Sequence, residues 1–297
     1  MRNLAYAIAL ALLPAIVAQT QPSVPQESTV RAIRLKLSAG DLASAESLLE
    51  QHKAETGMDS AYIVGLSWLA RGGALLRDWP AAEHYSALTR DLCAHSKDPD
   101  AIYALGSAIE VHAQVLEAQG NKQDAIAFLD EQAKAYKELP TAFRSRLYKR
   151  RNLIGLVGQP ASAITSDDNI AGPALNEGKP TVLFLWANYC GDCLSQSAAL
   201  GRFWQKYRGR GLRMLAVTRI YDDDAAKDKA KTASVWQSSY QALADVPVSI
   251  STEAMVRYGG SSTPAFVFID GHGIVRAYLP YRLTEQRLGE EAEKLLR

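Results

Sequence analysis

Residues 181–193, TVLFLWANYCGDC, join an unbroken apolar run to two cysteines separated by two residues. A short apolar run that follows Gly178-Lys179-Pro180 predicts a buried central strand. The residues after it, from Gly191 to Tyr207, predict a helix with Cys193 on its apolar face. The stretch therefore places Cys190 where a strand ends and a helix begins.

That position predicts redox chemistry for the two cysteines. Unpaired N–H groups and the helix dipole stabilise an anion at a helix N-terminus, which favours the reactive thiolate of Cys190. Cys193 lies one turn further along the helix and is expected to be less accessible. It can attack a mixed disulfide formed by Cys190 and close a Cys190–Cys193 disulfide.

Two other interpretations of the pair remain open. A zinc site needs two more ligands, and only Cys93 and five scattered histidines are left to supply them. A purely structural disulfide would close so short a loop that it would constrain the unfolded chain only slightly. We therefore expect no metal and no organic cofactor.

The rest of the C-terminal half alternates strands and helices. We expect strands at 211–219, 246–250, 265–269 and 274–279, and helices within 222–241, 252–258 and 284–297. The residues Asp270-Gly271-His272-Gly273 join the last two strands as a hairpin. This order predicts an α/β domain, a mixed sheet with helices on both faces.

Residues 156–297 resemble the thioredoxin superfamily, and within it the exported bacterial thiol-disulfide oxidoreductases of the TlpA/ResA type. The resemblance rests on three features in order: the strand leading into WANYCGDC, the segment Ser262-Thr263-Pro264 before the strand at 265–269, and the glycine-bearing hairpin. It implies a cis peptide bond at Thr263–Pro264, with both residues shaping a substrate groove. It also implies that Trp186 and Tyr189 flank the thiols as apolar contact surface, although core packing remains an alternative for Trp186.

The sequence departs from the family pattern at three places. The residues between the cysteines, Gly191 and Asp192, lack the usual proline, and a carboxylate there disfavours the thiolate and predicts a reductant. Phe184 and Gln196 stand where relatives carry acidic residues, so no obvious proton acceptor replaces them, although Asp192 could serve. The segment 258–262, rich in glycine and serine, could widen or loosen the groove.

The N-terminus resembles an export signal. A short positive start precedes an apolar run of about 14 residues, too short for a comfortable membrane span, which needs about 20. We expect a cleaved signal peptide at 1–18, a polar linker at 19–26 and a periplasmic or otherwise extracytoplasmic mature protein. An uncleaved N-terminal membrane anchor is the alternative.

Residues 27–155 predict an all-α domain. Ala45, Ala82 and Ala125 are each followed three residues later by a large apolar side chain, at steps of 37 and 43 residues. This weak repeat resembles tetratricopeptide-type helical hairpins, and a plain helical bundle is the alternative. Either could bind a protein partner or merely cap the other domain. Cys93 within this region is expected to be a buried thiol, a regulatory or intermolecular role being the alternative.

These features together predict an exported thiol-disulfide oxidoreductase that acts on the disulfides or thiols of other exported proteins, with electrons from an upstream thiol protein. The formal net charge of +1 argues against binding nucleic acid through bulk charge. The main alternative is a helical interaction protein whose thioredoxin-like domain is a scaffold with little catalytic role. A thiol peroxidase fits the paired cysteines poorly.

Overall fold

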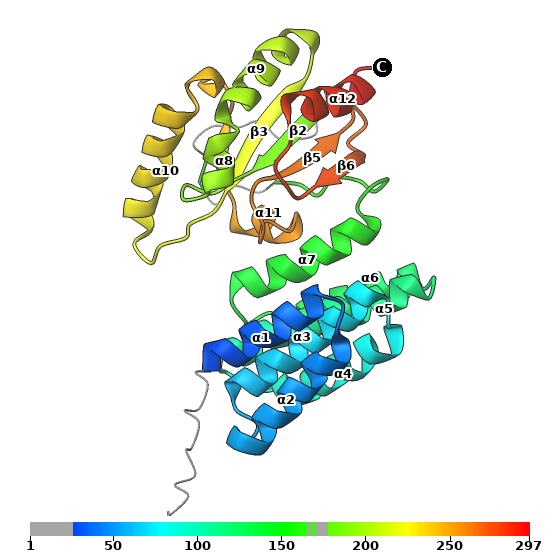
Figure 1. Ribbon diagram of the computed structural model, residues 1–297. Coiled ribbons are helices and arrows are strands. Elements are labelled where there is room, and N and C mark those ends of the chain that lie inside the picture. The colour runs from blue at the N-terminus through cyan, green and yellow to red at the C-terminus, as the bar shows by residue number, and fades with distance from the viewer. Residues whose placement is uncertain (1–25, 165–167, 170–177) are drawn as a thin grey trace, which may run out of the picture.

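The chain folds into a helical part followed by an α/β part (Figure 1). The computed structural model describes residues 26–164, 168–169 and 178–297. The predicted signal peptide and nearly all of the predicted linker lie outside these residues. No helix in the described ranges is long and apolar enough to cross a bilayer.

Residues 26–155 form helices only. Asp41, Asp59, Asp78 and Asp98 each precede a helix and accept a hydrogen bond from a backbone N–H of its first turn, which explains where these helices begin. The helices are α1 (Gln26–Ser38), α2 (Leu42–Thr56), α3 (Ser60–Leu76), α4 (Trp79–Cys93), α5 (Pro99–Ala118), α6 (Lys122–Ala135) and α7 (Thr141–Gly155).

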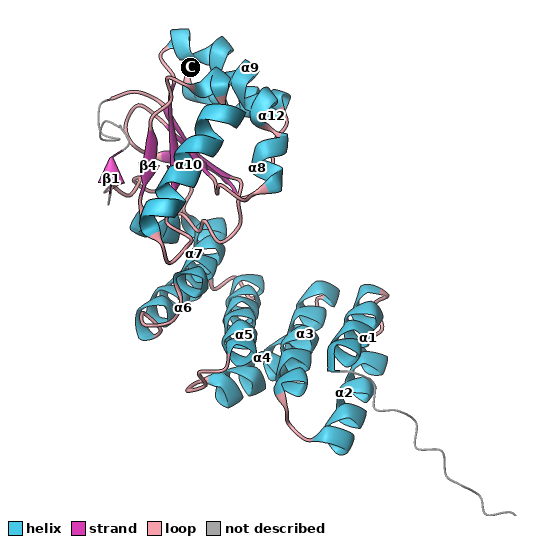
Figure 2. Cartoon of the chain, turned by 90° about the vertical axis from the view of Figure 1, so that its left-hand side faces the viewer, coloured by secondary structure: helices cyan, strands magenta, loops and turns pink. Residues whose placement is uncertain are grey.

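The helices pack in a regular order. In one layer α1 contacts α3, α3 contacts α5 and α5 contacts α7, while α2, α4 and α6 each bridge two successive members of that layer (Figure 2). Ala45, Ala82 and Ala125 are fully buried. A Cβ on Gly73 of α3 would lie 2.6 Å from the Ala82 nitrogen of α4, so the two backbones are in direct contact. Small residues thus permit the close helix packing that the sequence pattern predicted.

The α/β part holds a six-stranded sheet in the order β1-β4-β3-β2-β5-β6. The central strands β4, β3 and β2 are parallel, and β1, β5 and β6 pair antiparallel at the two sides. This confirms the predicted mixed sheet. The strands are β1 (Asp168–Asn169), β2 (Thr181–Leu185), β3 (Arg213–Thr218), β4 (Val248–Ile250), β5 (Ala265–Ile269) and β6 (Val275–Leu279).

Helices cover both faces of the sheet. Val182 and Phe184 of β2 pack under α9 (Ser197–Tyr207), α10 (Ala225–Ser239) and α12 (Glu285–Leu295). Leu183 and Leu185 point the other way, toward α11 (Thr252–Arg257) and the chain that follows α7. Because every residue of β2 is buried, the strand reads as a continuous apolar run rather than an alternating one.

Two local predictions were wrong. The helix expected over 191–207 is two helices, α8 (Gly191–Ser195) and α9, separated at Gln196. The Gln196 side chain is buried and its oxygen accepts a hydrogen bond from the Leu283 N–H, so the break coincides with a tertiary contact that periodicity does not reveal. The two-residue strand β1 was also missed, because it is too short to give a pattern.

Helix α7 belongs to both parts of the molecule. Phe143 and Leu147 lie in the core of the helical part. On another side of α7, the Ser145 hydroxyl donates to the Met255 carbonyl at 3.2 Å, and the Asn152 amide donates to the Arg257 carbonyl at 2.7 Å. The domain boundary expected at 155/156 therefore follows a helix that is itself the contact between the domains.

The glycine-rich segment before Thr263 is closely packed rather than loose. Gly259 has a φ of +68°, a conformation that favours glycine. A Cβ there would lie 2.5 Å from the Lys149 Cα of α7. The expectation that this segment loosens the groove is therefore wrong at Gly259, which lets α7 approach the sheet domain.

Candidate redox site

The two cysteines of the motif form a disulfide at the start of α8. Their Cα atoms are 5.2 Å apart. Cys190 is the N-cap residue, and its sulfur accepts a hydrogen bond from the Cys193 N–H at 3.1 Å. Cys190 is 8% exposed and Cys193 is fully buried. Cys190 thus keeps a small exposed fraction and Cys193 has none, as the sequence predicted for their relative exposure.

The helix behind Cys190 is only five residues long. A short helix contributes little macrodipole, whose effect in any case comes from the first turn. The N–H of Cys193, which points at the Cys190 sulfur, is the direct source of anion stabilisation after reduction. The local backbone, rather than a long helix, therefore supplies the hydrogen bond to this sulfur.

The Thr263–Pro264 peptide bond is cis, as the family resemblance implies. The Cys190 sulfur lies 3.3 Å from the Thr263 carbonyl oxygen. A disulfide sulfur carries no proton, so the contact becomes a hydrogen bond only when Cys190 is reduced to the thiol. The fold thereby brings two motifs 73 residues apart to one point.

The two aromatic residues of the motif have different surroundings. Tyr189 is 62% exposed, and its ring meets Tyr221 edge-on at 4.9 Å. Trp186 is fully buried and packs against Trp236 and Tyr240. The expectation that Trp186 offers contact surface is therefore wrong, and its core-packing alternative holds, because Trp236 of α10 and Tyr240 cover the ring. Its ring packs in the same hydrophobic core as Cys190, the last residue of the loop between β2 and α8 (residues 186–190, the redox loop).

A polar network beneath the redox loop was missed from the sequence. The Asn188 amide donates to the Asp228 carboxylate at 2.8 Å and to the Thr232 hydroxyl at 2.9 Å. The other Asp228 oxygen accepts from the Tyr221 N–H at 2.9 Å, and Asp228 is almost fully buried. Asp228, Thr232 and Trp236 recur at a spacing of four on α10, a signal that could have revealed this buried face.

The positions where relatives carry acids hold no acid here. Phe184 is fully buried and its ring stacks on Phe266 at 5.3 Å between centroids. Gln196 is buried, and its side-chain nitrogen has no hydrogen-bond partner among the described residues. Asp192 is exposed in the first turn of α8, beside the cysteines. It is the carboxylate nearest to them in sequence.

Cys93 lies apart from this site, in the core of the helical part. It is 1% exposed, and burial raises the pKa of its thiol to about 11. In the described ranges, no three His, Cys, Asp or Glu side chains gather in a way that could hold a metal ion.

Comparisons with known proteins agree with this description. Residues 157–278 match the model of the AhpC/TSA family. The matched residues run from the start of the α/β part to β6, so this part is similar to that family and has a thioredoxin-like fold.

Similar solved structures cover the same part of the chain. One is a secreted disulfide oxidoreductase of Mycobacterium tuberculosis homologous to E. coli DsbE, at 17% identity and a TM-score of 0.35, covering 45% of this chain and 96% of that one. Another is a thioredoxin-family thiol:disulfide interchange protein of Chlorobium tepidum, at 17% identity and a TM-score of 0.36, covering 47% of this chain and 97% of that one. A third is the thioredoxin domain of a Bacteroides vulgatus thiol-disulfide oxidoreductase, at 16% identity and a TM-score of 0.36, covering 48% of this chain and 98% of that one.

Proposed function

We propose that this protein reduces disulfides in other exported proteins, with Cys190 as the attacking thiol and Cys193 as the resolving thiol. The observation that carries the proposal is the placement of the Cys190–Cys193 disulfide at a helix start, 3.3 Å from the carbonyl before cis-Pro264. A purely structural disulfide gives no reason for the more accessible sulfur to face that carbonyl.

The reaction begins from the reduced pair. The Cys190 thiolate attacks one sulfur of a substrate disulfide, the substrate S–S bond breaks, and one substrate sulfur leaves as a thiolate that takes up a proton. Cys193 then loses its proton and attacks the Cys190 sulfur, which releases the second substrate thiol. The Cys190–Cys193 bond closes, and two electrons have passed to the substrate. A reduced thiol protein returns two electrons by the reverse exchange.

The substrate is proposed to lie across the redox loop and the cis-proline loop, which is the segment 258–264 between α11 and β5. Thr263 and Pro264 form the wall next to Cys190, and the exposed ring of Tyr189 is an apolar contact on the surface beside the cysteines. Gly191 at the first helical position leaves open space, since no atom lies within 4 Å of where its Cβ would be. A polypeptide can therefore approach the Cys190 sulfur from this side.

Two features support the direction and the place of the reaction. The exposed Asp192 carboxylate disfavours the Cys190 thiolate, which lowers the reduction potential and favours a reductant. The apolar N-terminal run supports export by a cleaved signal peptide into the periplasm or another extracytoplasmic compartment.

The order of contacts among α1 to α7 supports tetratricopeptide-like hairpins as the carrier of a protein-binding surface.

Insulin reduction by dithiothreitol tests the proposal against the scaffold alternative. Wild type should accelerate insulin precipitation, Cys190→Ser should reduce the rate to the uncatalysed level, and Cys93→Ser should match wild type as the control. Trapping with Cys193→Ser should yield mixed disulfides of exported proteins. If Cys190→Ser is as fast as wild type, the redox proposal fails. Consumption of hydrogen peroxide faster than exchange would instead favour a thiol peroxidase.

A further inference from the structure

A row of alternating cations and aromatic rings crosses the layer formed by α1, α3, α5 and α7. Arg34 of α1 and Arg71 of α3 lie over the Trp68 ring at 4.6 and 4.5 Å from its centroid. Arg71 and Arg146 of α7 lie over the Tyr103 ring of α5 at 5.1 and 5.2 Å. We call these five residues the cation–aromatic row. They come from four helices, so only the stacking of the helices brings them together.

The row leads to the cis-proline loop. At its α7 end Arg71, Tyr103, Arg146 and Lys149 line a hollow of about 550 Å³ together with Ser261 and Ser262. The Lys149 ammonium donates to the Ser262 hydroxyl at 3.0 Å. Ser262 precedes Thr263, whose carbonyl meets the Cys190 sulfur. The hollow therefore adjoins the proposed substrate groove.

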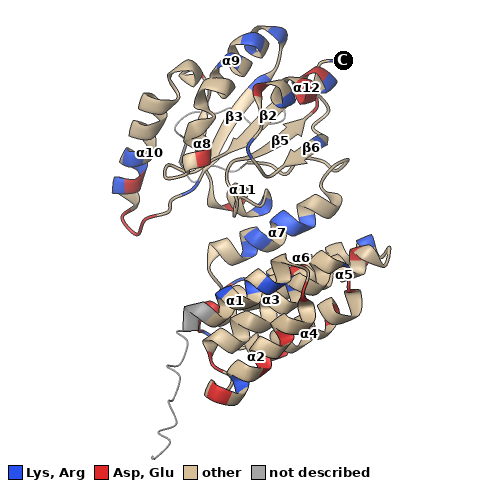
Figure 3. Ribbon diagram, in the orientation of Figure 1, with Lys and Arg blue, Asp and Glu red and all other residues tan. Residues whose placement is uncertain are grey.

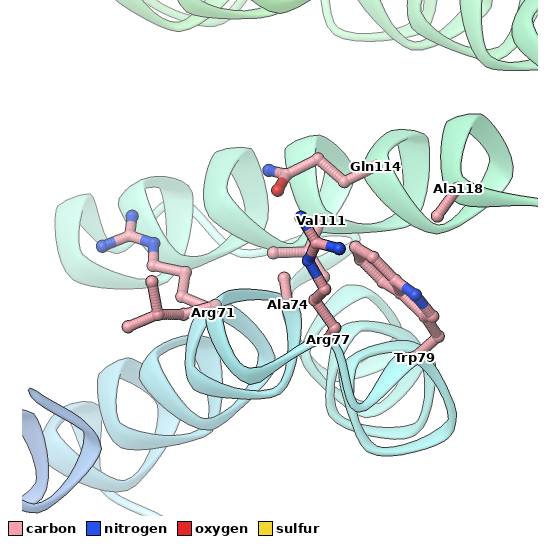
Figure 4. A pocket seen from close by; sticks show the side chains of 8 residues that line it. Arg71, Ala74, Arg77, Trp79, Val111, Gln114 and Ala118 are labelled. Atoms are coloured by element: carbon pink, nitrogen blue, oxygen red, sulfur yellow. The ribbon is translucent and has the colours of Figure 1, made fainter. Parts of the chain in front are cut away.

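A second hollow continues the surface past Arg71. It measures about 700 Å³ and lies between the end of α3, the start of α4 and α5. Figure 4 shows Arg77 and Gln114 extending into it beside the Trp79 ring. Both hollows are lined by Arg71, so they lie next to each other.

This surface carries an excess of positive charge. Figure 3 shows Lys and Arg concentrated along α7, between the two parts of the molecule. Glu110 is the one acidic residue that lines the first hollow, and it pairs with Arg146 at 2.6 Å. Arg71 donates to the hydroxyls of Tyr103 and Ser107, and Lys149 to a serine hydroxyl. Within the described ranges neither forms an ion pair with a carboxylate.

Arg71 is also partly removed from water. Burial, the largest influence, lowers the pKa of its guanidinium from the ordinary value, and the nearby Arg146 charge acts in the same direction, while the Tyr103 hydroxyl and the Glu110 carboxylate act against it. A cation that is desolvated and bonded only to neutral oxygens gains from an incoming anion more than a fully hydrated one does. The surface is thus electrostatically complementary to carboxylates.

We propose that the cation–aromatic row and its two hollows bind an acidic segment of the protein whose disulfide is reduced. The inference rests on the proposed function, because it is the adjoining Cys190 that makes a polypeptide the fitting occupant. A chain held at Thr263 by its cysteine would continue past Ser262 into the first hollow. Its Asp and Glu side chains would meet Arg71 and Lys149, and its apolar groups the rings of Trp68 and Tyr103.

The test compares two synthetic peptides that each carry one cysteine as a mixed disulfide with thionitrobenzoate. One has Asp and Glu on both sides of the cysteine, and the other has Asn and Gln at the same positions. Reduced protein is mixed with each, and thionitrobenzoate release is followed by absorbance. Wild type should react about tenfold faster with the acidic peptide at low salt, and high salt should remove the preference.

Two variants locate the effect. Arg71→Gln and Lys149→Gln should each reduce the ratio of the acidic-peptide rate to the neutral-peptide rate about threefold. Lys134→Gln, exposed on α6 in the other helix layer, is the matched control and should keep the full preference. Unchanged melting temperatures would show that the variants remain folded.

The outcomes separate this inference from the proposed function. If wild type reacts with both peptides at equal rates, exchange stands and the acidic docking surface is wrong. If it reacts with neither peptide, the proposed function fails and the inference fails with it. Loss of the preference in Lys134→Gln as well would also overturn the docking site. Binding of phosphatidylglycerol vesicles through Arg71, without a peptide preference, would overturn it in favour of a lipid surface.

Discussion

The surroundings of Cys93 and of Cys190 differ more than their burial does. Cys93 is 1% exposed and Cys190 is 8% exposed, so both sulfurs are largely covered. Around Cys93 lie apolar side chains of the helical core, and burial raises the pKa of its thiol. Around Cys190 lie a backbone N–H, a carbonyl oxygen and a second sulfur. Reactivity follows from these polar neighbours and not from exposure alone.

The largest expected difference is in alkylation. After reduction, iodoacetamide at neutral pH should modify Cys190 at least about a hundredfold faster than Cys93, whose thiolate is scarce below its pKa of about 11. Labelling of Cys93 should rise about tenfold for each pH unit up to that value while the protein stays folded. Peptide mass spectrometry over a time course measures both rates. Equal labelling at neutral pH would remove the contrast between the two thiols.

The same raised pKa has a consequence for stability with a definite sign. The unfolded thiol ionises near pH 9, the ordinary value, whereas the folded one holds its proton to about 11. The folded state therefore binds more protons between these values, and the free energy of unfolding falls as pH rises through this window. Cys93→Ser should flatten that part of the pH dependence in thermal melts.

A smaller effect is expected from the network that supports the redox loop. Asp228→Ala removes the carboxylate that accepts from the Asn188 amide and the Tyr221 N–H, so the buried amide keeps only its bond to the Thr232 hydroxyl and the half-buried Tyr221 N–H loses its acceptor. We expect a loss of about 2–4 kcal/mol in the free energy of unfolding and slower exchange. Denaturant titration and the insulin assay measure the two effects.

Asp228→Asn is the matched variant, because its side-chain oxygen can still accept one of those bonds. It should lose less stability than Asp228→Ala. An Asp228→Ala variant as stable and as fast as wild type would show that the loop does not depend on this support.

The smallest expected effect concerns the charge beside the cysteines. Asp192→Asn should stabilise the Cys190 thiolate and raise the reduction potential of the pair by about 10–30 mV, a modest shift because Asp192 is exposed. Equilibration with glutathione buffers measures the potential. Glu131→Gln, exposed on α6, is the control and should leave the potential unchanged. A more negative potential in Asp192→Asn would reverse the argument for a reductant.

Much of the site could be predicted because its signals are local. Three of these signals are short, and each has a direct physical meaning. They are an apolar run, two cysteines at the start of a helix and a Thr-Pro pair before a strand. The strands β2 and β5 follow from the apolar runs at 181–187 and 265–269, although β2 ends two residues before its run does; a fully buried strand needs no alternation. The burial of Ala45, Ala82 and Ala125 likewise follows from their spacing.

The sequence alone therefore determined the order of strands and helices along the C-terminal half and the cysteine pair at a helix start, and its family resemblance implied the cis-proline. Only the tertiary structure decided that Trp186 is core, that Asp228 lies under the redox loop and that α7 packs against Gly259. It also assembled the cation–aromatic row from four helices. These features depend on contacts between residues far apart in the chain, and the local propensities and periodicities that predict single elements carry no information about which faces will meet.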